Sequence, residues 1–253
     1  AAMKTYFGED CNSYSVRTFR DAMEAIEEGA ADYAVLPIEN STAGAVNEVY
    51  DLLVEFENYI VGEVIIPITH TLAGLPGTQL SELKRVYSKA EALMQTTRFL
   101  EEHSDWQQIS VANTAIAAKK ILDDQDRTQA AVCSAYAAKV YGLEVLEDNI
   151  NDESGNCTRF IIVTNQKVFL KGAKKISICF EVPHESGSLY HLLSHFIYND
   201  LNMSKIESRP IEGRSWEYRF FVDFEGNLEE PGVKNALRGL REESRSLKIL
   251  GNY

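Results

Sequence analysis

The chain alternates short apolar segments with amphipathic ones as far as residue 164, and this alternation constrains the possible folds more than any other feature. Residues 18–28 carry apolar side chains at helical spacing and stop at Gly29, which predicts an amphipathic helix. Residues 33–38 are short and apolar and predict a strand. Such alternation favours an α/β fold, in which a parallel or mixed sheet has helices on both faces. The other expected strands are residues 60–68, 86–88, 109–112, 130–133, 143–146 and 159–164, and the other expected helices are residues 46–53, 91–102, 114–122 and 135–141.

The composition changes after Gln166, where residues 167–175 carry four lysines and no acid. This segment predicts a linker between two domains. We expect a first domain over residues 1–166, a linker over 167–174 and a second domain over 175–253. The second domain has the order βαββαβ, which is that of the ferredoxin-like split βαβ fold. Its expected strands are residues 176–182, 204–210, 216–224 and 246–250, and its expected helices are residues 188–200 and 232–242.

The charge balance excludes two classes of partner. The 253 residues include 25 Lys and Arg against 38 Asp and Glu, which gives a formal net charge of −13. Such a surface repels phosphate backbones and acidic lipid headgroups, and no dense basic cluster offsets it. The longest strongly apolar stretch, residues 64–68, is too short to span a bilayer. We therefore expect neither nucleic acid nor a membrane as a partner.

The cysteines and histidines do not predict a metal site. The four cysteines lie far apart, without the spacing of a zinc site or of a disulfide framework. They are typical of reduced thiols in a cytoplasmic protein. His191 and His195 are four residues apart, but the glutamate of an H-E-x-x-H pattern and a third ligand are both missing.

Three polar clusters lie at strand ends, where ligands bind in α/β folds. The first contains Asn40 and Ser41, which could instead cap the next helix. The second combines Ser88 with residues 113–115, whose expected helix could bind an anion through its first backbone N–H groups, or could simply be capped there. The third places Arg159 at the end of a strand. A buried guanidinium needs an anionic partner, either a bound carboxylate or an acid of the chain itself.

Several motifs of catalysis are missing from the sequence. It contains no G-x-S-x-G turn, no glycine-rich phosphate loop, no kinase signature and no convincing nucleophile–histidine–acid set. Any catalysis must therefore use hydroxyls, amides, an arginine and oriented backbone dipoles. Such groups suit a reaction whose substrate supplies its own driving force.

Further strings accompany the polar clusters. They are P-I-E-N-S at residues 37–41, V-N-E-V-Y-D-L-L at 46–53, V-Y-S at 86–88 with Ala92, Leu93 and Gln95, Thr114-Ala115 with Ala117-Ala118, Y-G-L at 141–143, N-C-T-R-F at 156–160, N-M-S-K-I-E-S-R-P at 202–210 and W-E-Y at 216–218. The T-R-F and E-S-R-P strings are highly specific in this order and separation. Together the strings resemble those of prephenate dehydratases of the bacterial P-protein type, which carry a C-terminal ACT regulatory domain. The resemblance covers nearly the whole chain.

The resemblance implies decarboxylative dehydration of prephenate to phenylpyruvate in phenylalanine biosynthesis, without cofactor or metal. It also implies a catalytic region of two α/β subdomains, similar to type 2 periplasmic binding proteins, with the active site in the cleft between them. By the resemblance, Thr158 is the catalytic residue that assists departure of the ring hydroxyl, Arg159 binds a substrate carboxylate, and Phe160 packs beneath the ring. The other substrate-binding residues that it implies are Asn40, Ser41, Ser88, Thr114, Ala115 and Asn156.

In the second domain the resemblance implies feedback inhibition by phenylalanine. The effector would bind at an interface between two ACT domains, in a homodimer or homotetramer. Gly187 would let a backbone amide approach the ligand at the positive end of a helix, although a simple strand-to-helix turn also explains this glycine. The effector-binding residues that the resemblance implies are Gly187, Ser188, Leu189, Asn202, Glu207, Ser208, Arg209 and Pro210.

The chain also departs from the family pattern. The family's opening strand and glycine-rich loop are missing, because this sequence begins inside the helix that follows them. Glu91 stands where glutamine is usual, and its carboxylate would repel a dianionic substrate. Lys89, Asn113 and Ser188 stand where histidine, serine and alanine are usual.

Three alternatives stay open. An arogenate dehydratase would use a carboxylate such as Glu91 to attract the ammonium group of its substrate. A non-catalytic amino-acid sensor could keep the fold and the effector site, although the retention of Thr158 and Arg159 argues against it. The chain could also be one part of a longer chorismate mutase–dehydratase fusion.

Overall fold

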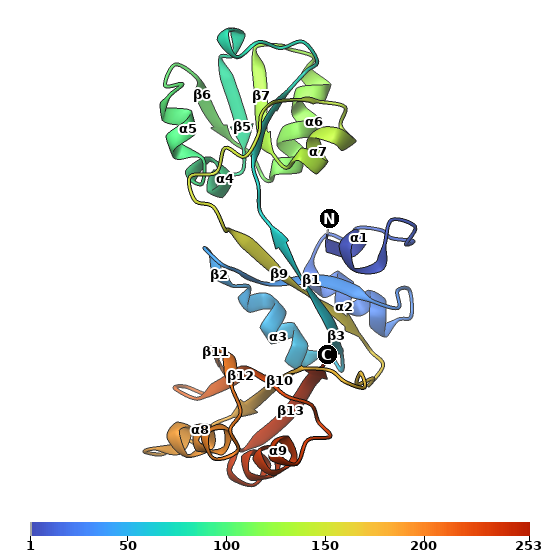
Figure 1. The fold of residues 1–253 in the computed structure, drawn as a ribbon, viewed down its shortest axis with the longest axis vertical. Helices are drawn as coiled ribbons and strands as arrows, with labels where there is room; N and C mark the ends of the chain where they lie inside the picture. Colours follow the sequence, from blue (N-terminus) through green and yellow to red (C-terminus); the bar gives the residue numbers. More distant parts are fainter. Residues whose placement is uncertain (1) are drawn as a thin grey trace. The chain divides into compact units, whose positions relative to one another are not determined.

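The computed structural model describes residues 2–253, which divide into two compact units (Figure 1). Residues 67–157 form one of them, which we call the inserted unit because both of its ends connect to the other. Residues 2–66 and 158–253 together form the second, which we call the composite unit. The chain passes between the units at the end of β3 (Tyr59–Pro67) and at the start of β9 (Cys157–Thr164).

The inserted unit is built on a five-stranded mixed sheet in the order β6-β5-β7-β4-β8. Strand β5 is parallel to β6 and β7, whereas β4 is antiparallel to β7 and β8. Buried side chains of α6 and α7 pack in one core and those of α4 and α5 in another, so helices cover both faces, as predicted. The bounds are β4 Thr71–Gly74, η1 Leu80–Glu82, β5 Arg85–Ser88, α4 Ala90–Met94, α5 Thr97–Glu101, β6 Gln107–Ser110, α6 Thr114–Asp124, β7 Gln129–Cys133, α7 Ala135–Val140 and β8 Glu144–Glu147.

Several helices begin where the sequence supplies a capping side chain. At α2 (Phe19–Glu27) the Thr18 hydroxyl accepts the N–H of Asp21 at 3.1 Å, and the Asp21 carboxylate accepts the N–H of Thr18 at 3.0 Å. Asn113 and Ser134 cap α6 and α7, because the side-chain oxygen of each accepts an N–H three residues further on. These bonds satisfy N–H groups that have no partner inside the helix.

Two features of the inserted unit differ from the prediction. The predicted helix over residues 91–102 is two short helices, α4 and α5. The Thr96 hydroxyl donates to the carbonyl oxygens three and four residues before it, at 3.3 and 2.9 Å, and the Asp152 carboxylate accepts the first two N–H groups of α5 at 2.9 and 2.8 Å. Strand β4 lies outside the predicted strands, because its four residues are all buried and give no alternating pattern.

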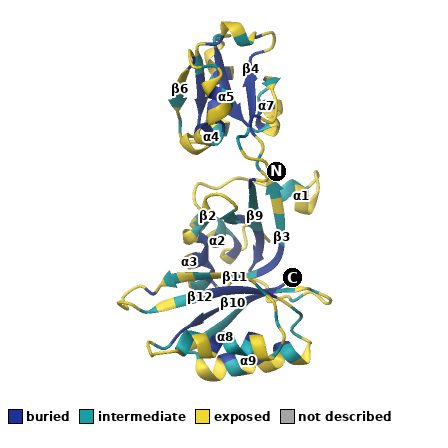
Figure 2. Cartoon of the chain, turned by 60° about the vertical axis from the view of Figure 1, so that its left-hand side comes forward, coloured by how far each residue is buried: buried dark blue, intermediate teal, exposed yellow. Residues whose placement is uncertain are grey.

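The composite unit is built on an eight-stranded sheet in the order β11-β12-β10-β13-β3-β9-β1-β2. Its last six elements have the predicted order βαββαβ. Their four strands are antiparallel neighbours in the arrangement of a ferredoxin-like split βαβ. Helices α8 and α9 cover one face of these strands and bury Phe180, Phe196 and Phe224 beneath them (Figure 2). The remaining bounds are α1 Ala2–Phe7, β1 Ala34–Asn40, β2 Gly44–Ala45, α3 Asn47–Glu55, β10 Lys175–Glu181, α8 Ser188–Tyr198, β11 Met203–Pro210, β12 Tyr218–Glu225, α9 Pro231–Glu243 and β13 Ser246–Asn252.

Strand β13 joins the βαββαβ domain to the rest of the composite unit. It pairs in parallel with β3 at Gly251 and Ile60. A Cβ atom on Gly251 would lie 2.2 Å from the carbonyl oxygen of Ile60, so only glycine permits this approach. On the sheet face opposite α8 and α9, Phe221 and Leu250 share a core with α3. Residues 167–174 lie outside helices and strands, but the domains on either side of them share one sheet and one core.

The described residues give no sign of a metal centre or of a membrane span. None of the described helices is long and apolar enough to cross a membrane. Residues 2–253 contain no group of three or more His, Cys, Asp or Glu side chains that could hold a metal ion. None of the four cysteines, all of which lie within residues 2–253, forms a disulfide. Burial raises the pKa of Cys133 and of Cys179 to about 11, so both thiols stay protonated and unreactive near neutral pH.

We expect Gly251→Val to destabilise the chain by about 1–3 kcal/mol, because the new side chain meets a backbone carbonyl that cannot turn away. The melting temperature, followed by circular dichroism, should fall. Ser246→Ala, at an exposed position of the same strand, should leave it unchanged. A Gly251→Val variant that melts with the wild type would contradict the close approach of β13 to β3.

Candidate functional site

Two neighbouring strands of the composite unit, β1 and β9, carry the first candidate residues. Thr158 pairs with Asn40, and Arg159 pairs with Glu39. A bulge between Pro37 and Glu39 shifts the register by one residue, so Asn40 rather than Glu39 lies opposite Thr158. Asn40 Nδ2 donates to Thr158 Oγ1 at 3.0 Å. The structure thus brings two of the predicted site residues into contact, and both are half-buried.

The Asn40 side chain also holds the turn that follows β1. Its Oδ1 accepts the N–H of Thr42 at 3.0 Å and the N–H of Ala43 at 2.9 Å. The alternative in which Asn40 or Ser41 caps the next helix is wrong, because β2 intervenes and α3 begins only at Asn47, without a side-chain cap. Since the two N–H groups fix the amide oxygen toward the turn, the amide nitrogen faces the hydroxyl on β9. Ser41 is exposed in this turn.

Arg159 lies on the other face of β9 from the threonine before it, because successive strand residues point to opposite faces. Its Nη2 donates to Asp223 Oδ2 at 2.5 Å, its Nε lies 3.5 Å from Glu63 Oε2, and its Nη1 lies 3.9 Å from Glu39 Oε2. Only 13% of its side chain is exposed. Burial lowers the pKa of this guanidinium, but Asp223 and the other negative charges outweigh burial, and the net shift is upward. Of the two predicted kinds of partner, the structure shows acids of the chain itself.

The candidate residues of the inserted unit lie at the carboxyl ends of its parallel strands. Ser88 ends β5 and residues 113–115 follow β6, so they share one edge of the sheet. Ser88 is fully buried and its hydroxyl donates to the carbonyl oxygen of Val132 at 2.6 Å. Asn113 caps α6, while Thr114 and Ala115 form its first turn. This edge therefore presents the positive end of an 11-residue helix.

Asn156 belongs to a buried amide and imidazole network in the inserted unit. Its Nδ2 donates to Gln95 Oε1 at 3.2 Å, and His70 Nε2 lies 2.9 Å from the same oxygen. The backbone N–H of His70 donates to Asn151 Oδ1 at 2.6 Å. His70 and Asn151 are not among the predicted site residues, because an isolated polar residue before a short buried strand carries no local pattern in the sequence.

The carboxylate of Glu91, expected to repel a dianion, has a partner of its own. Lys89 Nζ lies 3.0 Å from Glu91 Oε1, and both side chains are about half exposed. A hydrogen bond from the Glu91 backbone N–H, followed by Lys89, lowers the pKa of this carboxyl. Glu91 therefore stays ionised while its charge is offset locally.

Comparison with known proteins shows which family the chain belongs to. A family model described as "Prephenate dehydratase" matches residues 1–168. The chain belongs to the prephenate dehydratase family. A relative from Aquifex aeolicus, a bifunctional chorismate mutase/prephenate dehydratase, is 39% identical over 250 residues, which cover 98% of this chain and 68% of the relative. A relative from Arabidopsis thaliana, arogenate dehydratase/prephenate dehydratase 6, is 36% identical over 270 residues, which cover 100% of this chain and 65% of that protein.

Solved structures show the same mixed α/β fold. Prephenate dehydratase from Arthrobacter aurescens in complex with L-Phe matches with a TM-score of 0.90 and 32% identity, over 100% of this chain and 84% of that one. GqqA, described as a novel type of quorum quenching acylase, matches with a TM-score of 0.91 and 31% identity, over 99% and 91% of the two chains. The chain spans about two thirds of the length of the curated relatives it matches, since it covers 65% to 69% of the first three.

Four of the predicted effector residues lie at the two ends of α8: Gly187, Ser188 and Leu189 at its start, and Asn202 beyond its other end. Gly187 precedes the helix with a φ of 81°, in the left-handed region that favours glycine, and the Ser188 hydroxyl donates to the Pro183 carbonyl oxygen at 2.6 Å. Half-buried Leu189 follows. Asn202 lies beyond the other end of α8, whose 11 residues span roughly 16 Å. One chain therefore does not bring Gly187 and Asn202 together.

The E-S-R-P string on β11 divides between two faces of the sheet. Arg209 donates to the Asp51 carboxylate of α3, from Nε at 3.1 Å and from Nη2 at 2.6 Å. Glu207, two residues earlier on the strand, lies on the same face. Ser208 and Pro210 are exposed and face the side of the sheet that α8 and α9 cover. Only these two members of the string can therefore face a ligand on the helical side.

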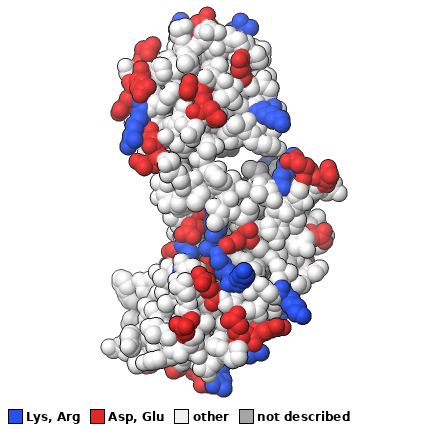
Figure 3. Space-filling view, in the orientation of Figure 1, with Lys and Arg blue, Asp and Glu red and all other residues white. Residues whose placement is uncertain are grey.

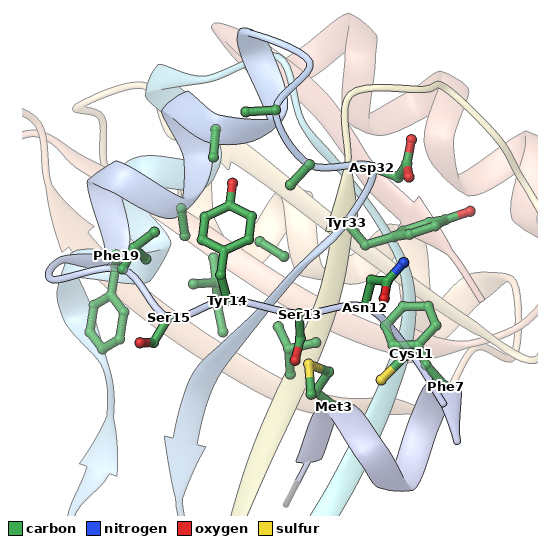
Figure 4. A pocket seen from close by; sticks show the side chains of 18 of the residues that line it. Met3, Phe7, Cys11, Asn12, Ser13, Tyr14, Ser15, Phe19, Asp32 and Tyr33 are labelled. Carbon is green, nitrogen blue, oxygen red and sulfur yellow. The ribbon is translucent and has the colours of Figure 1, made fainter. Parts of the chain in front are cut away.

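A groove of about 890 Å³ lies beside β1 in the composite unit (Figure 4). Side chains of α1, of the extended segment 11–17 and of α2 line it, together with residues 34–36 of β1. Among the described lining residues there is none of the predicted site residues. Strand β2 pairs with β1 only at Glu39 and Asn40, so the edge of β1 along residues 34–36 lies outside that pairing. The groove is therefore separate from the Thr158–Asn40 pair.

We expect Gln95→Leu to lower the free energy of unfolding of the inserted unit by about 1–3 kcal/mol, because it removes the acceptor shared by His70 and Asn156. Thermal unfolding measures the change. Met94→Gln, at the exposed neighbouring position, should leave stability unchanged. Equal melting of wild type and Gln95→Leu would show that the shared acceptor does not stabilise the unit.

Proposed function

We propose that the chain is a prephenate dehydratase, a carbon–oxygen lyase that forms phenylpyruvate, and that Thr158 assists departure of the ring hydroxyl. Membership of the family supports the reaction. The observation that carries the role of Thr158 is its hydrogen bond with Asn40.

The reaction breaks two bonds of the prephenate ring. The bond from the ring to its carboxylate breaks, and the electron pair enters the ring as carbon dioxide leaves. The bond from the ring to the hydroxyl oxygen breaks at the opposite carbon, and with one proton the leaving group becomes water. Because the ring becomes aromatic, the substrate supplies the driving force. The enzyme must hold the dianion and offer a proton or hydrogen bond to the leaving oxygen.

The Thr158 hydroxyl can donate a hydrogen bond to the leaving oxygen. A threonine hydroxyl has one proton and can also accept hydrogen bonds. Because the Asn40 amide nitrogen can only donate, Thr158 Oγ1 accepts in this pair and its own proton is available to a substrate oxygen. A donor placed at a leaving oxygen contributes about 3 kcal/mol. Since threonine is a weak acid, it acts by hydrogen bonding or by relaying a proton.

Attraction of the substrate dianion must be local, because the chain carries a formal net charge of −13. Thr114 and Ala115, in the first turn of α6, and the Asn156 amide are our candidates for substrate binding, with Phe160 and Ser41 as further candidates beside the Thr158–Asn40 pair. We do not propose Arg159 for the substrate carboxylate, since its guanidinium faces three carboxylates of the chain.

Arogenate and an acylase substrate should be assayed in parallel with prephenate. Several relatives are arogenate dehydratases, but Glu91, the residue that favoured arogenate, is paired with Lys89. The likeness to an acylase of the same fold shows that the fold admits another reaction. Turnover of prephenate, of arogenate and of an acylase substrate by the same preparation separates the three activities.

We infer that the βαββαβ domain is an ACT domain that binds phenylalanine and inhibits the enzyme. The L-Phe complex of the Arthrobacter aurescens relative supports this effector. Gly187 and Asn202 lie at opposite ends of α8, so they can meet at one ligand only if two copies of the chain contribute. Strand β11 is at the edge of its sheet and carries the exposed Ile206, as a surface for a second copy requires. We therefore propose a dimer as the smallest regulated form.

Thr158→Ala should lower kcat for prephenate by roughly 10²- to 10³-fold without changing the melting temperature, because it removes one donor and little packing. Thr158→Ser keeps the hydroxyl and should retain a large part of the activity. Phenylpyruvate formation, followed by its absorbance, provides the measurement. Near-normal turnover by Thr158→Ala would remove this residue from the mechanism.

Asn40→Asp tests the direction of the hydrogen bond. A carboxylate still accepts the turn N–H groups of Thr42 and Ala43, but on its other side it accepts the Thr158 proton instead of donating. We expect kcat to fall by roughly 10²-fold while the hairpin persists. Thr42→Ala keeps the same backbone bond and is the control. If Asn40→Asp had the same kcat as Thr42→Ala, the reaction would not depend on the proton of the Thr158 hydroxyl.

Gly187→Ala should weaken phenylalanine binding by roughly tenfold, which corresponds to about 1.4 kcal/mol, because the methyl group occupies the approach to the start of α8. Titration calorimetry measures the affinity. Gly172→Ala is the matched control, since Gly172 has the same φ of 81° with open space around it. Absence of phenylalanine binding to the wild type would remove the proposed regulation.

A further inference from the structure

Arg159 lies at the centre of a group of charged side chains in the composite unit, which we call the Arg159 cluster. Figure 3 shows acidic and basic side chains adjoining one another across the middle of this unit. The cluster joins strands of the βαββαβ domain to β1, β3 and β9. Its members are Glu39, Glu63, Arg159, Lys175, Lys205 and Asp223.

Each carboxylate around the guanidinium is tied to the βαββαβ domain. Asp223 belongs to that domain, on β12. Glu39 accepts a hydrogen bond from Lys205 Nζ of β11 at 2.7 Å. Glu63 accepts a hydrogen bond from Lys175 at the start of β10. The domain therefore holds the guanidinium directly through one strand and indirectly through two lysines on two others.

The carboxylate of Asp223 is itself fixed on both sides. Its Oδ2 accepts the guanidinium bond, and its Oδ1 accepts the Ser177 hydroxyl at 2.6 Å. Ser177 Oγ lies 2.8 Å from the phenol oxygen of Tyr253. Burial, followed by the charge of Asp223, raises the pKa of Tyr253, so the phenol stays protonated and can bond. Asp223 thus has a defined position relative to β10 and to the chain's last residue.

A cluster of this kind is better at fixing geometry than at adding stability. The side chains of Arg159, Asp223 and Lys205 are 13%, 10% and 12% exposed. Desolvation of buried charges offsets most of their mutual attraction, so apolar residues would often stabilise the same space as well. What apolar residues do not supply is a set of directed bonds between particular strands.

The cluster touches both strands at the residue next to the proposed catalytic pair. Arg159 follows Thr158 on β9, and Glu39 precedes Asn40 on β1. Consecutive Cα atoms are about 3.8 Å apart and the peptide between them is rigid. A displacement of Arg159 or Glu39 therefore moves the backbone that carries the hydroxyl or the amide.

We propose that the βαββαβ domain sets the position of the Thr158–Asn40 pair through the Arg159 cluster, with Asp223 and Lys205 as positioning residues. This inference rests on the proposed dehydratase function of that pair. It assigns Arg159 a part in holding the catalytic strand and not in binding substrate.

The same contacts give phenylalanine a route to the catalytic pair. Strand β11 carries Lys205 on the face toward Glu39, and it carries Ser208 and Pro210, two candidate effector residues, on the opposite face. A ligand that shifts β11 thereby shifts Lys205 against Glu39. Loss of the cluster should weaken inhibition without weakening phenylalanine binding.

Asp223→Asn tests the proposal. The amide keeps an oxygen for Ser177 and nearly the same volume, but it loses the charge opposite Arg159. We expect kcat for prephenate to fall on the order of 10- to 100-fold, with KM within about twofold, because the proton donor is misplaced while substrate contacts persist. Phenylalanine affinity by calorimetry should stay within about twofold, and phenylalanine should inhibit the residual activity less. Lys205→Gln, at the edge of the cluster, should shift kcat and inhibition in the same direction if Asp223→Asn does not fold.

Asp51→Asn is the matched control. It removes another ion pair of β11, that of Arg209 with Asp51 on α3, and neither of these two residues belongs to β9 or β1. Its kcat should equal that of the wild type. Arg159→Met distinguishes the positioning role of Arg159 from the substrate-binding role that the sequence resemblance implies. Loss of a substrate-binding group raises KM, whereas loss of a positioning group lowers kcat.

The outcomes are distinct. A wild type that does not convert prephenate would overturn the proposed function, and this inference with it. An active wild type together with an unchanged kcat in Asp223→Asn and Lys205→Gln would overturn the inference alone. A rise in KM without a fall in kcat for Arg159→Met would also overturn it, because it would return Arg159 to the substrate. A fall in kcat for Asp51→Asn as large as that for Asp223→Asn would show a general loosening of the domains and would overturn the specific role of the cluster.

Discussion

The ion pair between Arg159 and Asp223 is the contact on which the arrangement of the composite unit most depends. A guanidinium with 13% of its side chain exposed must be balanced by nearby acids, and here the acids come from β1, β3 and β12. The same sheet continues across this point, from β11 at one edge to β2 at the other. The C-terminal domain is therefore not joined to the rest only by a linker, since it shares a sheet, a core and a charge cluster with β1, β3 and β9.

One strand serves two purposes because its successive residues point to opposite faces. On β9, Thr158 meets Asn40 on one face and Arg159 meets Asp223 on the other. The bulge in β1 completes the arrangement, because it places Asn40 opposite Thr158 and Glu39 opposite Arg159. The residue proposed for the chemical step and the residue that makes the structural contact are thus separated by one peptide bond. That closeness gives the proposed regulatory domain a way to act on catalysis without a long chain of intermediate contacts.

The sequence was sufficient for most of the fold and for the family. Periodicity and caps such as Thr18 predict α2 and α6, and the βαββαβ order of the last domain is observed. It failed where tertiary contacts decide: Thr96 and Asp152 divide a predicted helix, and the buried β4 has no alternating pattern. The sequence did not determine the anionic partner of Arg159 for the same reason. Local sequence shows that a buried arginine needs an anion, but only the pairing of strands distant in sequence shows that Asp223 supplies it.

The most direct test of the central claim is hydrogen exchange of backbone amides with and without phenylalanine. If the effector acts through the Arg159 cluster, exchange should change both at β11 and along residues 157–161 of β9, which include Thr158, the proposed catalytic residue. Exchange should stay unchanged on strands β6 and β8 of the inserted unit. A response confined to α8 and β11, with β9 unchanged at saturating phenylalanine, would contradict the account.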